Sequence, residues 1–438
     1  MRRSLSGAVA AALLAIAARA QGAGFELYEQ GPAAIGMNGA FTAKADDASA
    51  IFYNPAGIAL YDGGSVMLGA SYATQGFSLR TADAQPVSAS STSGQFVLPT
   101  VYASSHIGKY VALGVGLFTQ FGAGVTWNPG TQNGMTVPFP GRFLGQSISL
   151  QTVTINPTIA FHPIDQLAVG IGIDILRGSV DLTRSVQFAD QEGTARLGGA
   201  GGAVGFNIGV LAVLIPKRLS VGLSYRSGVS PDFNLNVHFT GAPPELKDNV
   251  YDQKGMTTLN LPHNLTGGVA VHPTSHFTLT TDVHYSLWSD FKDLVVTFPE
   301  GKTPGFTAHQ GWQDAWSVRL GGEYLIAGFA LRLGLGYEVG AIPAAEFQPT
   351  TPVNDKILVS AGIGYKYKGF GVDAAYLAGI QREFTSTNTD LPATYGASTG
   401  HLVNIAFSYE WGRADECGHC GDCKGKKCCH GKSEDRSN

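Results

Sequence analysis

GFELYEQ (residues 24–30), ADDAS (45–49) and YNPAG (53–57) are three motifs in one Gly- and Ala-rich stretch near the N-terminus. This stretch is too irregular to form membrane strands, which alternate polar and apolar residues. From Ser65 onward, in contrast, the chain alternates in repeated runs. A polar N-terminal segment followed by many alternating strands predicts a plug inside a barrel.

Residues 1–23 have the features of a secretory signal peptide. Two arginines are followed by an apolar core and an A-x-A cleavage site. Cleavage after Ala20 or after Ala23 is expected. An N-terminal membrane anchor is the alternative, but the apolar run is shorter than the ~20 residues that a spanning helix needs.

The composition favours an outer-membrane protein. Charged residues make up 14% of the chain, against about 25% in soluble proteins. No apolar run after the signal is long enough for a helical span. An exported, poorly charged, Gly-rich chain of this kind is typical of a membrane β-barrel. The net charge of -4 argues against a nucleic-acid partner.

Alternation with period two marks the expected strands. Apolar side chains occupy every odd position in residues 111–117, 219–225, 329–337 and 403–411. Small or polar residues stand between them. This is the strand signature, and in each case we expect the apolar face to contact lipid.

Short turns and long loops alternate along the chain, as they do in outer-membrane barrels. Six turns and seven loops join fourteen antiparallel strands between about Gly64 and Trp411, which places both termini on the periplasmic side. The turns lie near residues 108, 164–165, 216–217, 273–274, 327–328 and 368–369, and the loops near 83–95, 124–145, 188–201, 241–256, 299–311, 341–354 and 385–399.

The three opening motifs, in this order and position, resemble the hatch of the FadL family of outer-membrane transport proteins for long-chain fatty acids and other hydrophobic compounds. The resemblance implies a fourteen-stranded barrel (residues 63–411) with a hatch (24–62) in its lumen. It is carried onward by PTV (99–101), FGAG (121–124), PGRF (140–143), TINP (154–157), WSDF (288–291) and WQDA (312–315).

Asn54-Pro55-Ala56 predicts a defined bend. Pro fixes its own φ and biases Asn54 toward extended backbone, while the Asn side chain can bond nearby backbone. One reading is a simple turn into the first strand. The resemblance implies instead a part of the hatch that shifts before ligand passes, with Asp46 and Asp47 anchoring the plug to arginines of the lumen.

Charged residues at inward positions of the expected strands allow two interpretations. They pair with one another and with the plug, or an arginine receives a fatty-acid carboxylate, which its planar guanidinium matches. Arg319 and, near the N-terminus, Phe25 are candidate ligand contacts. The inward charges are Arg226, Asp282, His284, Arg319, Glu323, Arg332, Glu338 and Asp373.

Arg177 is the first candidate for the carboxylate. Apolar residues hold the odd positions of residues 169–175 but shift to even positions at Val180 and Leu182. A β-bulge at this change of parity would turn Arg177 and Asp181 inward.

The end of the third expected strand is a candidate lateral opening formed by Phe121, Gly122 and Gly124. Glycines inside a strand commonly mark bulges or kinks, and in the family a kink here opens a hole in the barrel wall. Gln120 stands where many relatives have Pro.

The loop that follows the third strand carries an apolar cluster that includes Trp127, Phe139 and Phe143. A capture groove for hydrophobic molecules is expected if these side chains are exposed. Self-packing of the long loop is the alternative.

Residues 412–438 form a polar tail on the periplasmic side that departs from the family pattern. Thiolates and imidazoles at short spacing can hold zinc or another thiophilic metal, whereas an oxidising periplasm favours disulfides. No other cofactor is expected. The residues concerned are Cys417, His419, Cys420, Cys423, Cys428, Cys429 and His430.

Together these features predict a passive, monomeric channel in the outer membrane of a Gram-negative-type bacterium. It captures a hydrophobic compound, above all a long-chain fatty acid, and releases it sideways when the hatch shifts. Aromatic hydrocarbons are the alternative ligand. A lipid-acting barrel enzyme is less well supported, since no G-x-S-x-G motif occurs, and an adhesive barrel has no use for a plug. Membrane lipid and the barrel assembly machinery are the other expected partners.

Overall fold

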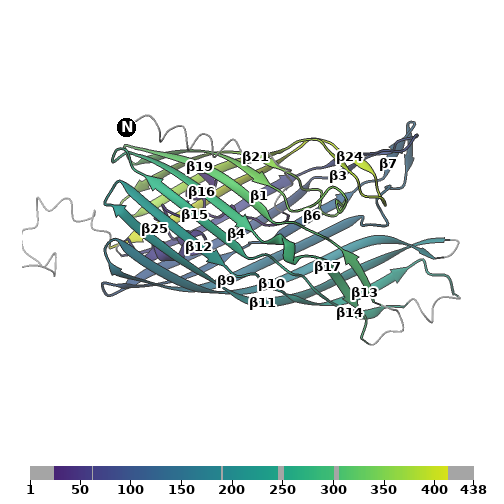
Figure 1. Ribbon diagram of the computed structural model, residues 1–438, viewed down its shortest axis with the longest axis horizontal. Helices are drawn as coiled ribbons and strands as arrows, with labels where there is room; N and C mark the ends of the chain where they lie inside the picture. The colour runs from purple at the N-terminus through teal and green to yellow at the C-terminus, as the bar shows by residue number, and fades with distance from the viewer. Residues whose placement is uncertain (1–23, 62, 189–190, 245–250, 300–304, 413–438) are drawn as a thin grey trace, which may run out of the picture.

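The computed structural model describes residues 24–61, 63–188, 191–244, 251–299 and 305–412. They form a closed antiparallel barrel of fourteen strands (Figure 1). The first strand pairs with the last from Gly64↔Trp411 to Thr74↔His401, which closes the sheet. The predicted strand number is therefore confirmed. In the described residues no helix is long and apolar enough to cross a membrane.

Nine of the strands are continuous, and five are each made of two pieces. The continuous strands are β1 (Gly64–Gln75), β4 (Gly94–Ile107), β9 (Ser147–Ile164), β10 (Leu167–Phe188), β11 (Gln191–Ile215), β20 (Phe329–Val339), β21 (Lys356–Tyr367), β22 (Phe370–Gln381) and β25 (Ser398–Trp411). The divided strands are β5 (Val111–Phe118) with β6 (Gly122–Trp127), β12 (Leu219–Arg226) with β13 (Asp232–Thr240), β14 (Gln253–Thr258) with β15 (Asn264–Val271), β16 (Phe277–Ser286) with β17 (Asp293–Thr297), and β18 (Phe306–His309) with β19 (Ala315–Ile326).

The six predicted short turns lie at one end of the barrel, and the long connections lie at the other (Figure 1). Short strands in those connections pair with one another at the loop end. They are β2 (Ser78–Thr81), β3 (Ser88–Thr92), β7 (Gly130–Gln132), β8 (Met135–Val137), β23 (Phe384–Ser386) and β24 (Ala393–Tyr395).

One predicted loop is wrong. Residues 188–201 were expected to leave the sheet, but β10 and β11 continue as a ladder that ends at Phe188↔Gln191. The start of β11 is rich in Gly and polar residues, so it lacks the apolar alternation on which the prediction rested. A strand that extends beyond the lipid has no need of an apolar outer face.

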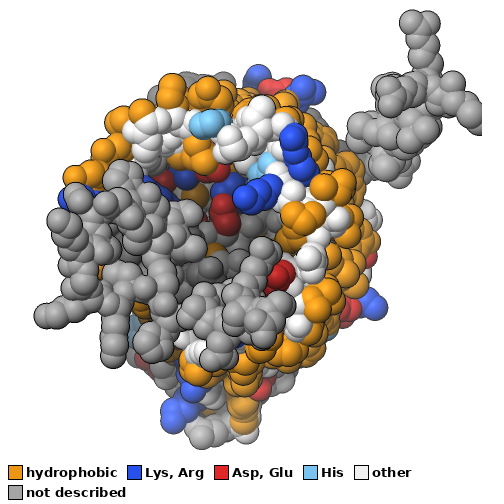
Figure 2. Space-filling model, turned by 90° about the vertical axis from the view of Figure 1, so that its left-hand side faces the viewer, with side chains coloured by type: hydrophobic (Ala, Val, Ile, Leu, Met, Phe, Trp, Pro, Cys, Tyr) orange, Lys and Arg blue, Asp and Glu red, His pale blue; other side chains and the backbone are white. Residues whose placement is uncertain are grey.

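Side-chain burial separates the two faces of the wall. Outward apolar residues such as Leu333 and Phe407 are 69% and 61% exposed, while inward Asp282 and Arg319 are each 1% exposed. Seen from the short-turn end, hydrophobic side chains surround the barrel and charged side chains gather inside it (Figure 2). This is the arrangement of a barrel whose outer face meets lipid.

Two rings of aromatic residues bound the apolar band. Near the short turns, aromatic pairs form across neighbouring strands, as at Phe329 and Tyr365 (ring centroids 4.7 Å apart). Toward the loop end, outward tyrosines hydrogen-bond a His or Asp. Such girdles mark the two membrane interfaces. The tyrosine pairs are Tyr225–His263 (2.7 Å), Tyr285–Asp314 (2.9 Å), Tyr337–Asp355 (2.9 Å) and Tyr376–His401 (2.7 Å).

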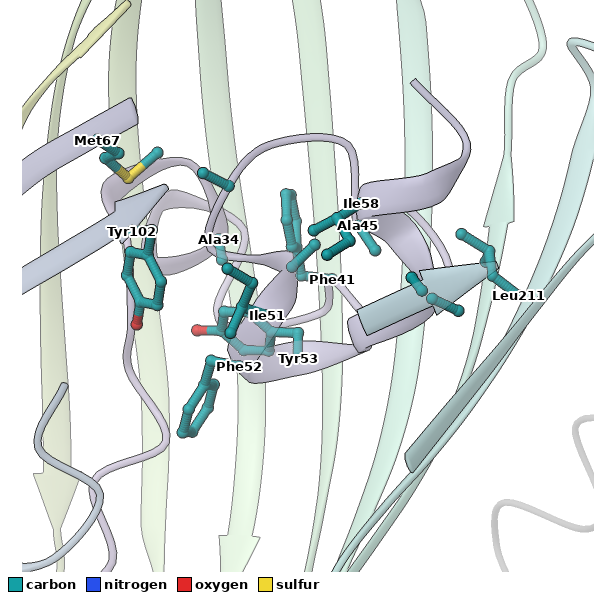
Figure 3. Close-up of a cluster of buried hydrophobic side chains, with 14 of the residues drawn as sticks. Ala34, Phe41, Ala45, Ile51, Phe52, Tyr53, Ile58, Met67, Tyr102 and Leu211 are labelled. Atoms are coloured by element: carbon teal, nitrogen blue, oxygen red, sulfur yellow. The ribbon is translucent and has the colours of Figure 1, made fainter. Parts of the chain in front are cut away.

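Residues 24–61, here called the N-terminal segment, pack against the inner face of strands around the barrel. The segment contains α2 (Pro32–Gly36), α3 (Ala50–Tyr53) and η1 (Pro55–Ala59). Figure 3 shows its apolar side chains gathered between Tyr102 of β4 and Leu211 of β11.

Hydrogen bonds tie this segment to the wall. The carboxylate of Asp282 on β16 accepts the backbone N–H groups of Phe41 (3.0 Å) and Thr42 (2.8 Å). The Asn54 side-chain amide donates to the carbonyls of Thr42 (2.9 Å) and Val210 on β11 (3.0 Å). Asn54 is extended, and its side-chain oxygen accepts from the Ala56 N–H, which forms the bend that the motif predicts.

Glycines let this bend lie directly on the wall. A Cβ at Gly170 would stand 2.4 Å from the carbonyl carbon of Pro55, and one at Gly209 would stand 2.1 Å from Oδ1 of Asn54. Neither strand position can carry a side chain while the segment stays in place.

The replacement Gly170→Leu tests this packing. The barrel should assemble, because the β10 ladder is unchanged, but the bend should be displaced and the N-terminal segment should become sensitive to protease. Heat-modifiable gel migration reports the barrel, and mass spectrometry after limited proteolysis reports the segment. Gly267→Leu is the control, since its Cβ would meet only Leu223, at 3.9 Å. Equal protection in both variants would contradict the prediction.

Candidate functional site

The barrel wall is interrupted in its third strand. β5 ends at Phe118 and β6 begins at Gly122. β4 pairs with β5 only from Val101↔Leu117 to Ile107↔Val111, and among the described ladders none joins Gly94–Thr100 of β4 to β6. The wall therefore has a break between β4 and β6, at the position where the sequence suggested a lateral opening.

The start of the N-terminal segment lies against this break. The Leu27 N–H donates to the Gln120 carbonyl (2.7 Å), and the Gly122 N–H donates to the Phe25 carbonyl (3.0 Å). These bonds supply partners for backbone groups that have left the ladder. The Glu26 carboxylate helps to hold residues 25–27 in place. It accepts hydrogen bonds from the side chains of Asn264 on β15 (2.7 Å) and Ser286 on β16 (2.9 Å).

Phe25 inserts into an aromatic cage. Its ring centroid lies 4.9 Å from Trp288, 5.5 Å from Trp312 and 6.4 Å from Phe121, all in edge-to-face geometry. Trp288 lies in η3 (Trp288–Asp290), and Trp312 precedes β19. The WSDF and WQDA motifs, far apart in the sequence, thus meet around the residue that the sequence suggested as a ligand contact.

A cavity of about 440 Å³ adjoins the break. Its lining is mainly apolar and comes from the N-terminal segment, β4, β9 and the opposite wall. Val97 and Val153, which also line it, are 69% and 39% exposed and belong to the outer face. The cavity therefore continues from the lumen through the wall. Its apolar lining includes Phe25, Leu27, Phe96, Leu98, Val125, Leu150, Leu358, Leu377 and Leu402.

Lys356 is a basic residue of the cavity that the sequence pattern did not predict. Its Nζ lies 3.2 Å from Oε1 of Glu338, and its side chain is 18% exposed. It opens β21 on the same face as the inward Leu358. Strict alternation would have found it, but its place at the end of a long loop hid the start of the strand.

Arg319 is occupied by the N-terminal segment and the wall. It pairs with Glu29 (2.9 Å) and Glu338 (2.9 Å), donates to the Asn38 carbonyl (3.1 Å), and stacks on Tyr28. It does not line the cavity. The arrangement supports the interpretation in which inward charges pair with one another and with the segment.

Asp46 and Asp47 make local contacts. Asp46 pairs with Lys44 (2.6 Å), which also reaches Glu323 on β19 (3.2 Å). Asp47 accepts from the backbone and hydroxyl of Ser49 (2.8 and 2.6 Å). An ion pair from the segment to a lumen arginine comes from Glu29, outside the ADDAS motif.

The prediction for Arg177 is wrong. The ladders of β10 run without a bulge through Leu176 and Arg177, and the Arg177 side chain is exposed on the outer face. Asp181 shares that parity and pairs with exposed Arg196 (2.6 Å). The apolar residues Val180 and Leu182 instead pack inside, in the cluster around Leu197 and Phe233. Beyond Arg177 the apolar side chains lie on the inner face and the polar ones on the outer face, because the strand has left the lipid. The alternation of inward and outward positions is unchanged.

The expected capture surface is partly wrong. Trp127 and Phe139 are 1% and 2% exposed and stack on each other with ring centroids 5.0 Å apart. Trp127 Nε1 also donates to the Pro349 carbonyl (2.8 Å). Phe143 is half-buried beneath the Arg142 guanidinium. The first two rings therefore follow the self-packing alternative and form the core of the loop end.

The signal peptide and the metal-ligand candidates of the tail, Cys417 to His430, lie outside the described residues. Within the residues that are described, no group of three or more His, Cys, Asp or Glu side chains could hold a metal ion.

Sequence comparison identifies relatives of nearly full length. The chain is 27% identical over 421 residues to the long-chain fatty acid transport protein of Escherichia coli strain K12, covering 85% of this chain and 90% of that protein. It is 24% identical over 450 residues to outer membrane protein P1 of Haemophilus influenzae strain Rd, covering 89% and 93%.

Structure comparison agrees on the fold. A Pseudomonas aeruginosa FadL homologue superposes with a TM-score of 0.77 at 18% identity, covering 89% of this chain and all of that one. The Ralstonia pickettii toluene transporter TbuX gives a TM-score of 0.66 at 19% identity, covering 88% and 99%.

The family profile described as "Outer membrane protein transport protein (OMPP1/FadL/TodX)" matches residues 13–410. Its members are transport channels of the Gram-negative outer membrane rather than enzymes. The chain therefore belongs to the FadL family of outer-membrane transporters of hydrophobic compounds.

Proposed function

We propose that this transporter takes up long-chain fatty acids passively and releases them sideways into the membrane through the break in its third strand. The observation that carries the proposal is the apolar cavity that continues from the lumen, past Gly122 and Gly124, to Val97 and Val153 on the outer face. An acyl chain on this path stays in contact with apolar side chains and avoids the aqueous periplasm.

Lys356 makes a fatty acid the best-fitting ligand. An ammonium group in an apolar cavity offers a charge-assisted hydrogen bond to a carboxylate. Its present partner, Glu338, also accepts from Arg319 (2.9 Å), so Glu338 stays paired when Lys356 turns to a ligand. A neutral aromatic hydrocarbon offers Lys356 only a weaker cation–π contact, which separates the two ligand classes.

The N-terminal segment acts in this proposal as the hatch. Residues 25–27 lie across the inner side of the break, and Glu26 and Phe25 hold them there. A local shift of these residues would join the lumen to the wall opening without unfolding the barrel. The short turns and both termini then face the periplasm, as in other barrels of this kind.

Replacing Lys356 with Met should weaken fatty-acid binding by ~10-fold or more, the effect of losing a charge-assisted hydrogen bond. Binding of oleic acid and of toluene to purified protein in detergent measures the effect. Toluene binding should change much less, because toluene loses at most a cation–π contact. Lys254→Met, which removes an exposed lysine of β14, is the control. Equal loss for both ligands, or none for oleic acid, would show that Lys356 is not the carboxylate partner.

Replacing Asn54 with Ala should lower uptake of radiolabelled oleic acid several-fold while the barrel stays folded. The change removes the bonds to Thr42 and Val210, so the segment loses one of its ties to β11 and keeps the bond from Asn207 to the Ile51 carbonyl (3.2 Å). Uptake is compared at equal surface levels. Asn236→Ala, which removes an exposed side chain of β13, is the control. Wild-type uptake by the Asn54 variant would argue against a role for the segment in release.

A further inference from the structure

Two apolar side chains stand in the break of the wall, at the two glycines of β6. A Cβ at Gly124 would lie 2.1 Å from Cζ and 2.7 Å from Cε1 of Phe96. A Cβ at Gly122 would lie 3.2 Å from Cδ1 of Leu27. The Phe96 ring therefore occupies the side-chain space of Gly124, and Leu27 lies in tight contact with that of Gly122.

The Phe96 ring reaches across the break. Phe96 belongs to β4 and has the inward parity of Leu98 and Thr100. Gly124 has the outward parity of β6, because Val125 and Trp127 are the buried positions of that strand. The ring of an inward residue thus occupies the place of an outward side chain on the facing strand. It also touches Gly94, whose Cβ would lie 2.7 Å from its Cε2.

Leu27 reaches the break from the lumen. Leu27 belongs to the N-terminal segment, so its side chain moves with that segment, which is bonded to the wall here through the Leu27 N–H and the Gln120 carbonyl (2.7 Å). Phe96 has no such link, since β4 is held by its ladder to β1, in which Phe96 faces Ala73. The two side chains are therefore carried by elements that can move independently.

We propose that Phe96 and Leu27 form a two-part gate in the lateral opening, and that Phe96 determines how fast a ligand passes through it. A shift of the segment withdraws Leu27. Phe96 remains on the wall and has to rotate away from Gly124 before an acyl chain can leave. Gly122 and Gly124 serve as receptors for the gate side chains. This inference rests on the lateral release proposed above.

A size series at position 96 tests the gate. Initial uptake of radiolabelled oleic acid by cells should rise roughly threefold in Phe96→Ala and fall by a similar factor in Phe96→Trp, because passage through a gate limits the rate. Oleic acid binding to the purified variants should stay within twofold of wild type. Phe206→Ala, which removes an exposed ring from the outer face of β11, is the matched control and should not change uptake.

A double-mutant comparison isolates the contact between Phe96 and Gly124. Gly124→Ala places a methyl group where the ring lies, so it should change uptake in the wild-type background and have little effect when Phe96 is already Ala. Such non-additivity is expected for residues in contact and not for distant, independent sites. Heat-modifiable migration normalises every variant to folded protein. Phe96→Leu takes the place of Phe96→Ala if the latter does not assemble.

The outcomes separate the two proposals. Uptake that does not follow the size of residue 96, or a Gly124→Ala effect that is the same in both backgrounds, refutes the gate. Failure of the wild-type protein to bind or take up oleic acid refutes the proposed function itself. Normal wild-type uptake with no response to position 96 leaves lateral release standing without this gate.

Discussion

A sheet in lipid has to satisfy every backbone hydrogen bond, and the rest of this structure depends on how that constraint is met at the third strand. β1 and β25 close the barrel, so the sheet has no free edge there. The wall is nevertheless broken at Thr119–Phe121, and the N-terminal segment supplies partners through the Phe25 carbonyl and the Leu27 N–H. The segment that lies against the break thus also supplies hydrogen-bond partners that the interrupted ladder lacks.

Buried charges in the lumen are likewise provided with partners. Arg319 joins Glu29 of the segment to Glu338 of the wall, and Arg332 joins Glu323 to Asp373. Removing one partner from such a pair is strongly destabilising, because it leaves the other charge buried and unpaired. These networks hold the segment in the half of the barrel near the short turns and leave the cavity above it largely apolar, with Lys356 as a basic group on its lining.

Local pattern predicted much of this architecture. Period-two alternation and short turns are properties of neighbouring residues, so they indicated the strand number and most connections. The same reasoning failed where polarity changed for a non-local reason. Near Arg177 the apolar residues change from the outer to the inner face because β10 leaves the lipid. The prediction assumed that apolar residues always face lipid, so it interpreted this change as a bulge.

By itself, the sequence determined the barrel, its order of strands and the bend at Asn54-Pro55-Ala56, because each depends on residues close together in the chain. For the break near Gly122, the glycines indicated a kink and the resemblance to the family implied the opening. Only the tertiary structure decided that Trp127 and Phe139 are buried, that Lys356 lines the cavity, and that Phe96 fills the space beside Gly124. Those facts arise where strands and loops distant in sequence meet. No local periodicity records which side chains will share such a space.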